Sequence, residues 1–188
     1  KITYEGDLKI TTKHAIDYYL QKKVEEPILP MNVMFLDIET YTKTRTHSNA
    51  QDVNDIIAII RYSFNGIKKS LVLDPKILGI QNQIIDTSNK EIVIFNSESK
   101  LITTFCDDVR NLEPDIISGW FSNDFDMQYI INRSKKIGVD IRKMSKFGEA
   151  DYNKFQFYPD VVGIVFLDMM ELYKTFSQGG RESYSLDF

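Results

Sequence analysis

Two carboxylates stand one residue apart at the end of a short apolar run. Asn32–Thr40 reads NVMFLDIET and contains neither glycine nor proline, which predicts a buried strand. Side chains alternate across a strand, so Asp37 and Glu39 are expected on one face, roughly 7 Å apart. No lysine or arginine occurs between Met31 and Tyr41 to neutralise them. Two interpretations follow: a divalent cation such as Mg²⁺ binds the pair, or the pair is solvated at a strand end.

A third acid, Asp126, lies near the start of a predicted helix that follows another predicted strand. A strand expected at 115–120 runs through a short loop into a helix expected at 123–137, and ligands of open α/β sheets bind at that edge. Asp126 is therefore a further candidate ligand, and its alternative role is a contact with the first turn of the helix. Asp124 is the stronger capping candidate. Asp168 ends a later apolar run, and capping of the following helix is the role we favour for it.

Composition limits the classes of function. The chain has 188 residues, 43% of them apolar, and a net charge of −4, which suits one well-buried domain. This acidic balance argues against a stand-alone, salt-driven nucleic-acid binder. It is compatible with a metal-dependent enzyme that acts on nucleic acid, because bound cations offset part of the charge.

Cysteine content and hydropathy bear on the compartment. Cys106 is the only cysteine, which excludes an intramolecular disulfide and a multi-thiolate metal site. No apolar run reaches membrane-spanning length, and the start lacks a signal-peptide pattern. We expect an intracellular protein, cytoplasmic or nuclear, that is not secreted and has no membrane partner. The start at Lys1 instead of Met indicates a piece of a longer chain.

Periodicity and turn residues predict the elements that position these acids. A lead-in over 1–30, with a short helix in 13–24, precedes a main domain over 31–188, and 139–158 is expected to be helix and loop. Asn65-Gly66 marks a hairpin turn. The expected strands are 32–40, 56–64, 70–74, 91–95, 115–120 and 161–168, and the expected helices are 97–112, 123–137 and 169–176. The order implies an α/β fold in which an antiparallel hairpin leads into parallel strands.

These residues resemble the exonuclease motifs of the family B (polymerase α-like) DNA polymerases. Phe35–Thr40 is similar to the first motif, and Gly119-Trp120 followed by Phe125-Asp126 is similar to the second. The resemblance spans nearly the whole chain in the family's order. The further matching segments are Tyr4–Asp7 before the first motif, Tyr129–Arg133 within the second, and Leu167–Lys174 and Ser183–Leu186 after it.

The resemblance implies an RNase H-like mixed sheet flanked by helices and a 3′→5′ proofreading exonuclease. It implies that Asp37 bridges two Mg²⁺ or Mn²⁺ ions, that Glu39 binds the first, and that Asp126 supports the second, partly through water. The ions would serve hydrolysis of the 3′-terminal phosphodiester of single-stranded DNA. Implied partners are the 3′ end of a primer–template and the palm, fingers and thumb of a polymerase. Candidate DNA contacts are Thr40, Tyr41, Phe121, Asn123 and Phe125.

The chain departs from the family at two points. Phe121 stands where the family usually has asparagine, and Asn123 lies two positions further on. The third motif, a tyrosine followed by an aspartate on a later helix, does not occur before Phe188. We therefore expect an active parent enzyme and a nearly inert isolated chain. The alternative is a non-catalytic DNA-binding or scaffolding module with a degenerate exonuclease fold, and a third interpretation is a free-standing exonuclease acting on RNA or small DNA.

Overall fold

The computed structural model describes Lys13, Asp17 and the ranges 30–43, 47–79, 91–153, 158–177 and 183–185. The chain divides into two compact units, 1–30 and 31–188, and the second is described below. The matching segment Tyr4–Asp7 and most of the helix expected in 13–24 lie outside the described residues. Leu186, in the last matching segment, does so as well.

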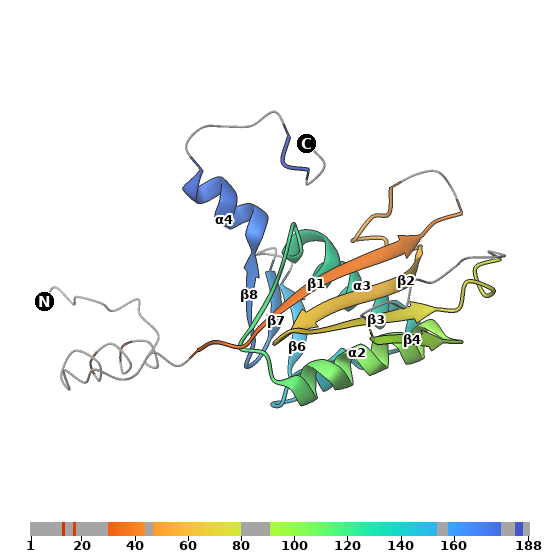
Figure 1. Ribbon diagram of the computed structural model, residues 1–188, viewed down its shortest axis with the longest axis horizontal. Coiled ribbons are helices and arrows are strands. Elements are labelled where there is room, and N and C mark those ends of the chain that lie inside the picture. Colours follow the sequence, from red (N-terminus) through yellow and green to blue (C-terminus); the bar gives the residue numbers. More distant parts are fainter. Residues whose placement is uncertain are drawn as a thin grey trace, which may run out of the picture. The chain divides into compact units, whose positions relative to one another are not determined.

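A six-stranded mixed sheet forms the centre of the second unit, in the order β4-β3-β2-β1-β5-β8 (Figure 1). The first three strands in sequence, β1, β2 and β3, are antiparallel, whereas β4, β5 and β8 each lie parallel to a neighbour. Asn65 and Gly66 both have positive φ and close the expected two-residue hairpin. The strands are β1 Val33–Tyr41, β2 Ile56–Phe64, β3 Ile67–Leu73, β4 Glu91–Phe95, β5 Ile116–Gly119 and β8 Val165–Asp168.

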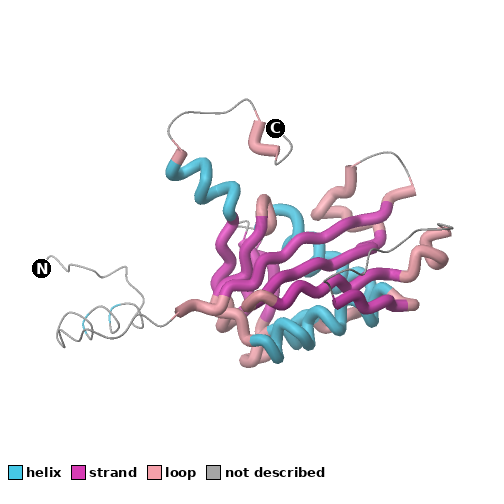
Figure 2. Tube along the Cα trace, viewed as in Figure 1, coloured by secondary structure: helices cyan, strands magenta, loops and turns pink. Residues whose placement is uncertain are grey.

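Helices flank this sheet, so the predicted α/β fold with a mixed sheet and flanking helices is confirmed (Figure 2). Helix α2, Glu98–Leu112, buries Leu101, Phe105 and Val109, which recur at helical spacing and join the core of the sheet. Cys106 belongs to the same buried side, and burial raises the pKa of its thiol to about 12. The remaining helices are α3 Gln128–Ile137, α4 Met169–Phe176, the π-helical turn η1 Asn123–Met127 and the 3₁₀ turn η2 Ile141–Met144.

A second, two-stranded sheet replaces part of the helix and loop predicted for 139–158. It pairs β6, Ala150–Asn153, with β7, Tyr158–Val161, so that prediction was wrong. β6 has only four residues, so its alternation of the exposed Asp151 and the buried Tyr152 is too short to predict a strand, and its pairing depends on a partner that local pattern does not reveal. The expected strand 161–168 is likewise shorter, because a turn at Gly163, with φ of 99°, separates β7 from β8.

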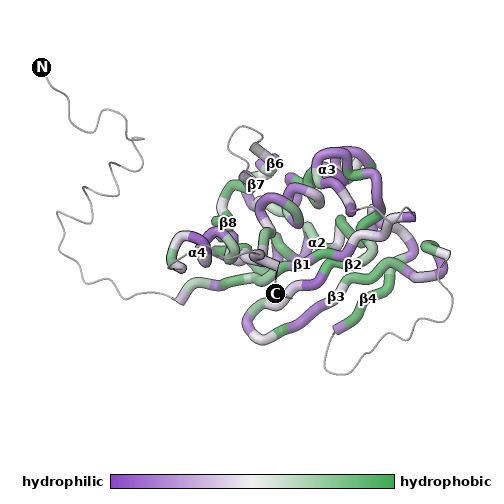
Figure 3. The backbone as a smooth tube through the Cα atoms, turned by 90° about the horizontal axis from the view of Figure 1, so that it is seen from above, coloured by the Kyte–Doolittle hydropathy of each residue, from purple (hydrophilic) through white to green (hydrophobic). Residues whose placement is uncertain are grey.

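The hydropathy of the chain differs between the large sheet and helix α3. Figure 3 shows apolar stretches concentrated in the strands of the large sheet and polar stretches along α3. Within the part of the chain that the structure describes, no helix combines the length and the apolar character needed to cross a membrane.

Candidate active site

The candidate site begins where β1 outruns its neighbour β5. Strand β5 pairs with β1 only as far as Phe35, opposite Ser118, and ends at Gly119, whereas β1 continues to Tyr41. A Cβ atom on Gly119 would lie 2.6 Å from the backbone oxygen of Leu36. Glycine is therefore required for the close approach of the two backbones at the point where β5 leaves the sheet. The edge of β1 beyond this point is open to another group.

Asp126 fills that open edge. Its Oδ1 accepts a hydrogen bond from the backbone N–H of Ile38 at 2.9 Å, and the side chain is 4% exposed. Burial raises the pKa of Asp126 to about 8, and the nearby charges of Asp37 and Asp168 also raise it. Asp126 keeps the alternative contact with its own turn, because its side chain also accepts its own backbone N–H, which lowers its pKa. The carboxylate in addition bridges η1 to β1 across 88 positions of sequence.

Asp37 and Glu39 are both exposed, and they alternate along β1 with the buried Leu36 and Ile38. They therefore share one face of the strand, and Asp126 joins the strand from its edge. Partial burial raises the pKa of Asp37, while the charge of Arg61, its cross-strand partner on β2, opposes that rise. The negative charge of Asp37 contributes to the raised pKa of Asp126, so the two carboxylates repel each other when both are deprotonated. A cation bound between them would reduce this repulsion.

Asp168 has the capping role that the sequence favoured. Its Oδ1 accepts the N–H of Met170 at 2.9 Å at the start of α4. The same carboxylate also accepts the N–H groups of Phe121 at 3.1 Å and Asn123 at 3.0 Å. It thus ties the loop after β5 to the end of β8. Asp124, the predicted cap of the helix at 123, does not occupy the capping position, because η1 begins at Asn123 and its N-cap residue is Ser122.

The aromatic and amide candidates after β5 differ in exposure. Phe121 is 41% exposed and has φ of 59°, a left-handed conformation that asparagine and glycine adopt far more readily. The Oδ1 atom of Asn123 is buried and has no hydrogen-bond partner among the described residues. Phe125 is half-buried, with its ring 5.6 Å from that of Tyr129.

The candidates at the end of β1 are held by a chain of hydroxyl contacts. Thr40 donates to the Oγ of Ser48 at 2.8 Å, and Ser48 donates to a carboxylate oxygen of Asp55 at 2.7 Å. Thr40 and Tyr41 are both half-buried, and His47 is exposed. The later part of the loop, from Ser48 to Asp55, is therefore tied to the end of β1.

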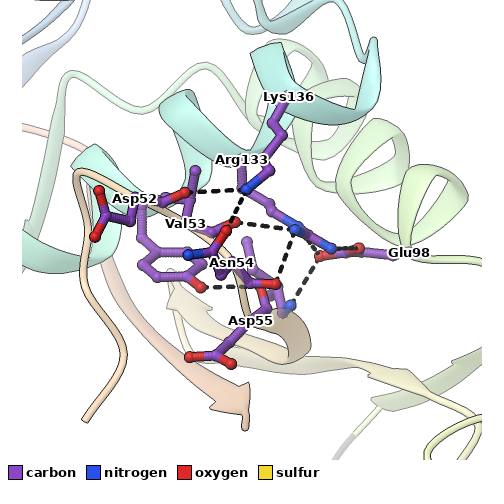
Figure 4. A network of polar contacts seen from close by, with 9 residues as sticks. Asp52, Val53, Asn54, Asp55, Glu98, Arg133 and Lys136 are labelled. Carbon is purple, nitrogen blue, oxygen red and sulfur yellow. Dashed lines mark hydrogen bonds and ion pairs between the residues drawn. The ribbon is translucent and has the colours of Figure 1, made fainter. Parts of the chain in front are cut away.

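A buried polar network that local sequence patterns did not reveal fixes this loop to the helices (Figure 4). Arg133 of α3 forms a bidentate ion pair with Glu98 of α2, with N···O distances of 2.7 and 2.9 Å. Its Nη1 donates to the backbone oxygen of Val53 at 2.9 Å, and Glu98 accepts the N–H of Ile57 at 2.8 Å. The hydroxyl of Tyr129 donates to the backbone oxygen of Asp55. Arg133 follows Tyr129 by one helical turn, and this spacing was the feature of the sequence that could have indicated that both contact the same loop.

Comparison with known proteins shows the family of the chain. The profile described as "DNA polymerase family B, exonuclease domain" matches residues 4–188. The chain belongs to this family. A curated "DNA polymerase 2" of Aeropyrum pernix is 28% identical over 117 residues, which is 62% of this chain and 12% of that protein. A "DNA-directed DNA polymerase" of Escherichia phage RB69 is 29% identical over 103 residues, or 50% of this chain and 11% of that protein. The chain thus spans about an eighth or less of these relatives.

The exonuclease domain offers oxygen ligands suited to a divalent metal. Asp37 supplies a carboxylate on the exposed face of β1, and Asp126 supplies one at the open edge of the same strand. In the described ranges, however, no three acidic, histidine or cysteine side chains lie close enough to hold a metal ion together. Carboxylate oxygens are the donors that Mg²⁺ and Mn²⁺ prefer, so the chemistry of Asp37 and Asp126 fits such an ion. A three-carboxylate set would need Glu39 to join the two.

Proposed function

We propose that this chain is the proofreading 3′→5′ exonuclease domain of a DNA polymerase. Its substrate would be the single-stranded 3′ end of a primer–template, and its partner the polymerase palm, fingers and thumb. The observation that carries the proposal is the meeting of two motifs of the matched family: Asp126, from the second, bonds to Ile38 in the first, beside Asp37.

In this proposal Asp37, Glu39 and Asp126 hold two Mg²⁺ or Mn²⁺ ions. When bound, such ions lower the pKa of a coordinated water and offset the charge of the scissile phosphate. The chain's own contribution is to keep Asp126 dry and oriented through Ile38. The residues that would contact the DNA are close in sequence to Glu39 or Asp126. They are Thr40, Tyr41, Phe121, Asn123 and Phe125.

The test is degradation of a 5′-labelled single-stranded DNA oligonucleotide with Mn²⁺ or Mg²⁺. The protein from the complete reading frame should shorten the DNA from its 3′ end, and Asp37→Ala should reduce the rate at least about a thousandfold, as expected for loss of a metal-supported step. Asp107→Ala, a carboxylate on α2, is the matched control and should leave the rate unchanged. An Asp37→Ala protein that degrades DNA at the original rate would refute the proposal.

We further propose that residues 1–188 by themselves are nearly inert. The support is the lack of a three-ligand cluster among the described side chains. The same oligonucleotide assay on the 188-residue chain tests this, and robust degradation abolished by Asp37→Ala would overturn it.

A second function is a non-catalytic DNA-binding or scaffolding module. The strained Phe121 at the position where the family usually has asparagine favours it. It predicts that the complete protein binds single-stranded DNA without degrading it, and that Asp37→Ala has no effect on either property.

A further inference from the structure

The face of the sheet that carries Asp37 extends across β2 and β3 as a shallow basic and aromatic surface. Cross-strand pairing places Asp37 opposite Arg61, Phe35 opposite Ser63, and Ser63 opposite Lys68. We name these five residues the open face. A depression of about 290 Å³ is lined by all five. Arg61 and Lys68 are exposed, and Phe35 is 51% exposed.

The cations of the open face are available to a ligand. Within the described residues, neither Arg61 nor Lys68 forms an ion pair or a side-chain hydrogen bond, although Arg61 faces Asp37. The neighbouring Lys69 differs, because it points to the other side of the sheet and pairs with Asp108 of α2 at 2.9 Å. Alternation along β3 therefore separates a lysine committed to structure from one that is free.

The composition of the open face matches one ligand chemistry. Grooves that bind single-stranded nucleic acid combine cations for the phosphates with aromatic rings on which bases stack. Arg61 and Lys68 lie diagonally on adjacent strands, which is within reach of long side chains, and Phe35 flanks them on β1. The chain as a whole has a net charge of −4, so two exposed cations beside a candidate catalytic carboxylate are not a consequence of a generally basic surface.

We propose that the open face binds single-stranded DNA upstream of the 3′ end, with phosphates on Arg61 and Lys68 and a base stacked on Phe35. The inference rests on the proposed function, because it takes Asp37 as the point where the 3′ end lies. It adds a path for the strand away from that point, across β2 toward β3. Arginine suits this place because its guanidinium can grip a phosphate with two parallel hydrogen bonds.

The experiment measures metal-free binding of a 5′-fluorescein-labelled 12-nucleotide oligo(dT) by fluorescence anisotropy. The 188-residue chain is used in EDTA at several salt concentrations. Arg61→Ala should weaken binding at least about fivefold and reduce the slope of log affinity against log salt by about 0.7 for each phosphate that is no longer neutralised. Phe35→Ala should weaken binding about tenfold with an unchanged slope, because stacking releases no counterions.

The matched control is Arg110→Ala, which removes the same charge from an exposed position of α2, the helix that packs on the opposite side of the sheet. It should change the affinity less than twofold. Circular dichroism confirms that each variant folds. Equal losses for Arg61→Ala and Arg110→Ala, or no binding by the unmodified chain at low salt, would overturn the open-face proposal. Because EDTA removes metal chemistry, either result leaves the proposed function to its own degradation assay, and failure of that assay leaves the binding result standing.

Discussion

Arg133 and Glu98 join helices α3 and α2 through a two-bonded, buried ion pair, with side chains only 10% and 12% exposed. The pair also fixes the backbone on both sides of the start of β2, through Val53 before the strand and Ile57 within it. The ion pair therefore stabilises the fold mainly by holding this loop against the two helices. Removal of one partner leaves the other charge buried and the loop without its anchor.

We therefore predict that Arg133→Met lowers the free energy of unfolding by about 3–5 kcal/mol, the usual cost of leaving a buried charge unpaired. The double variant Arg133→Met with Glu98→Gln should lose less than the sum of the two single variants. Urea unfolding followed by circular dichroism measures both. Lys135→Met, which removes a more exposed ion pair with Asp151, is the control and should cost less than about 1 kcal/mol. Additive losses would show that the two buried residues do not act together.

The pKa of Asp126 predicts how stability depends on pH. The folded carboxyl keeps its proton up to about pH 8, whereas the unfolded one releases it near its ordinary value of 3.8. The folded state thus binds more protons in that interval, so the stability from this group is fully present below pH 3.8 and is lost as pH rises to about 8. Asp126→Asn should flatten the decline by up to about 1.4 kcal/mol per pH unit. Denaturant unfolding at pH 5, 6.5 and 8 gives the two slopes, and identical slopes would contradict the assignment.

The same proton should appear in metal binding. A divalent ion at Asp37 and Asp126 requires the deprotonated carboxylate, so binding at pH 7 should release about one proton. Apparent affinity for Mn²⁺ should rise up to about tenfold per pH unit below pH 8. Isothermal titration calorimetry in two buffers with different ionisation enthalpies counts the protons. Asp126→Asn should abolish the release, and release that persists in this variant would assign the proton to another group.

Gly119 offers a steric test of the junction between β5 and β1. An added Cβ would lie 2.6 Å from the backbone oxygen of Leu36 and 2.8 Å from Cβ of Ser122, so Gly119→Ala should cost about 1–3 kcal/mol or more. Gly138→Ala has open space around its Cβ but a φ of +75°, so it measures the conformational cost alone, about 1 kcal/mol. Thermal unfolding should show the larger loss for Gly119→Ala. A smaller loss than in Gly138→Ala would mean that the two strands separate without cost.

Phe121 should carry measurable backbone strain. At φ of 59°, Phe121→Gly should be more stable than Phe121→Ala by about 1 kcal/mol, although both variants remove the ring. Phe121→Asn should fall between them, because asparagine tolerates this conformation. The pairwise comparison by chemical denaturation isolates the backbone effect from the removal of the ring. Equal stability of the glycine and alanine variants would place the strain elsewhere.

The elements that carried strong local signals were predictable from sequence. The hairpin at Asn65-Gly66 needs two residues with positive φ, and α2 shows apolar residues on one side over its whole length. The shared face of Asp37 and Glu39 follows from alternation alone. The helix predicted at 123–137 was correct in place, but its first five residues form a π-helical turn, η1.

What sequence could not show were relationships set by distant partners. β6 becomes a strand through β7, and Arg133 finds Glu98 35 positions away, which no local period encodes. The bond from Ile38 to Asp126 is of the same kind, since it depends on where β5 stops. Local sequence patterns therefore predicted which residues are candidate ligands. Which of them lie close together depends on the tertiary structure.

The free edge of β1 beyond β5 has a consequence for the behaviour of the chain in concentrated solution. An unpaired strand edge is a template on which a second molecule can add a strand, and such additions seed aggregation. Asp126 occupies the Ile38 amide on that edge with a buried acid. By this contact Asp126 removes one free amide from the edge on which a strand of a second molecule could pair.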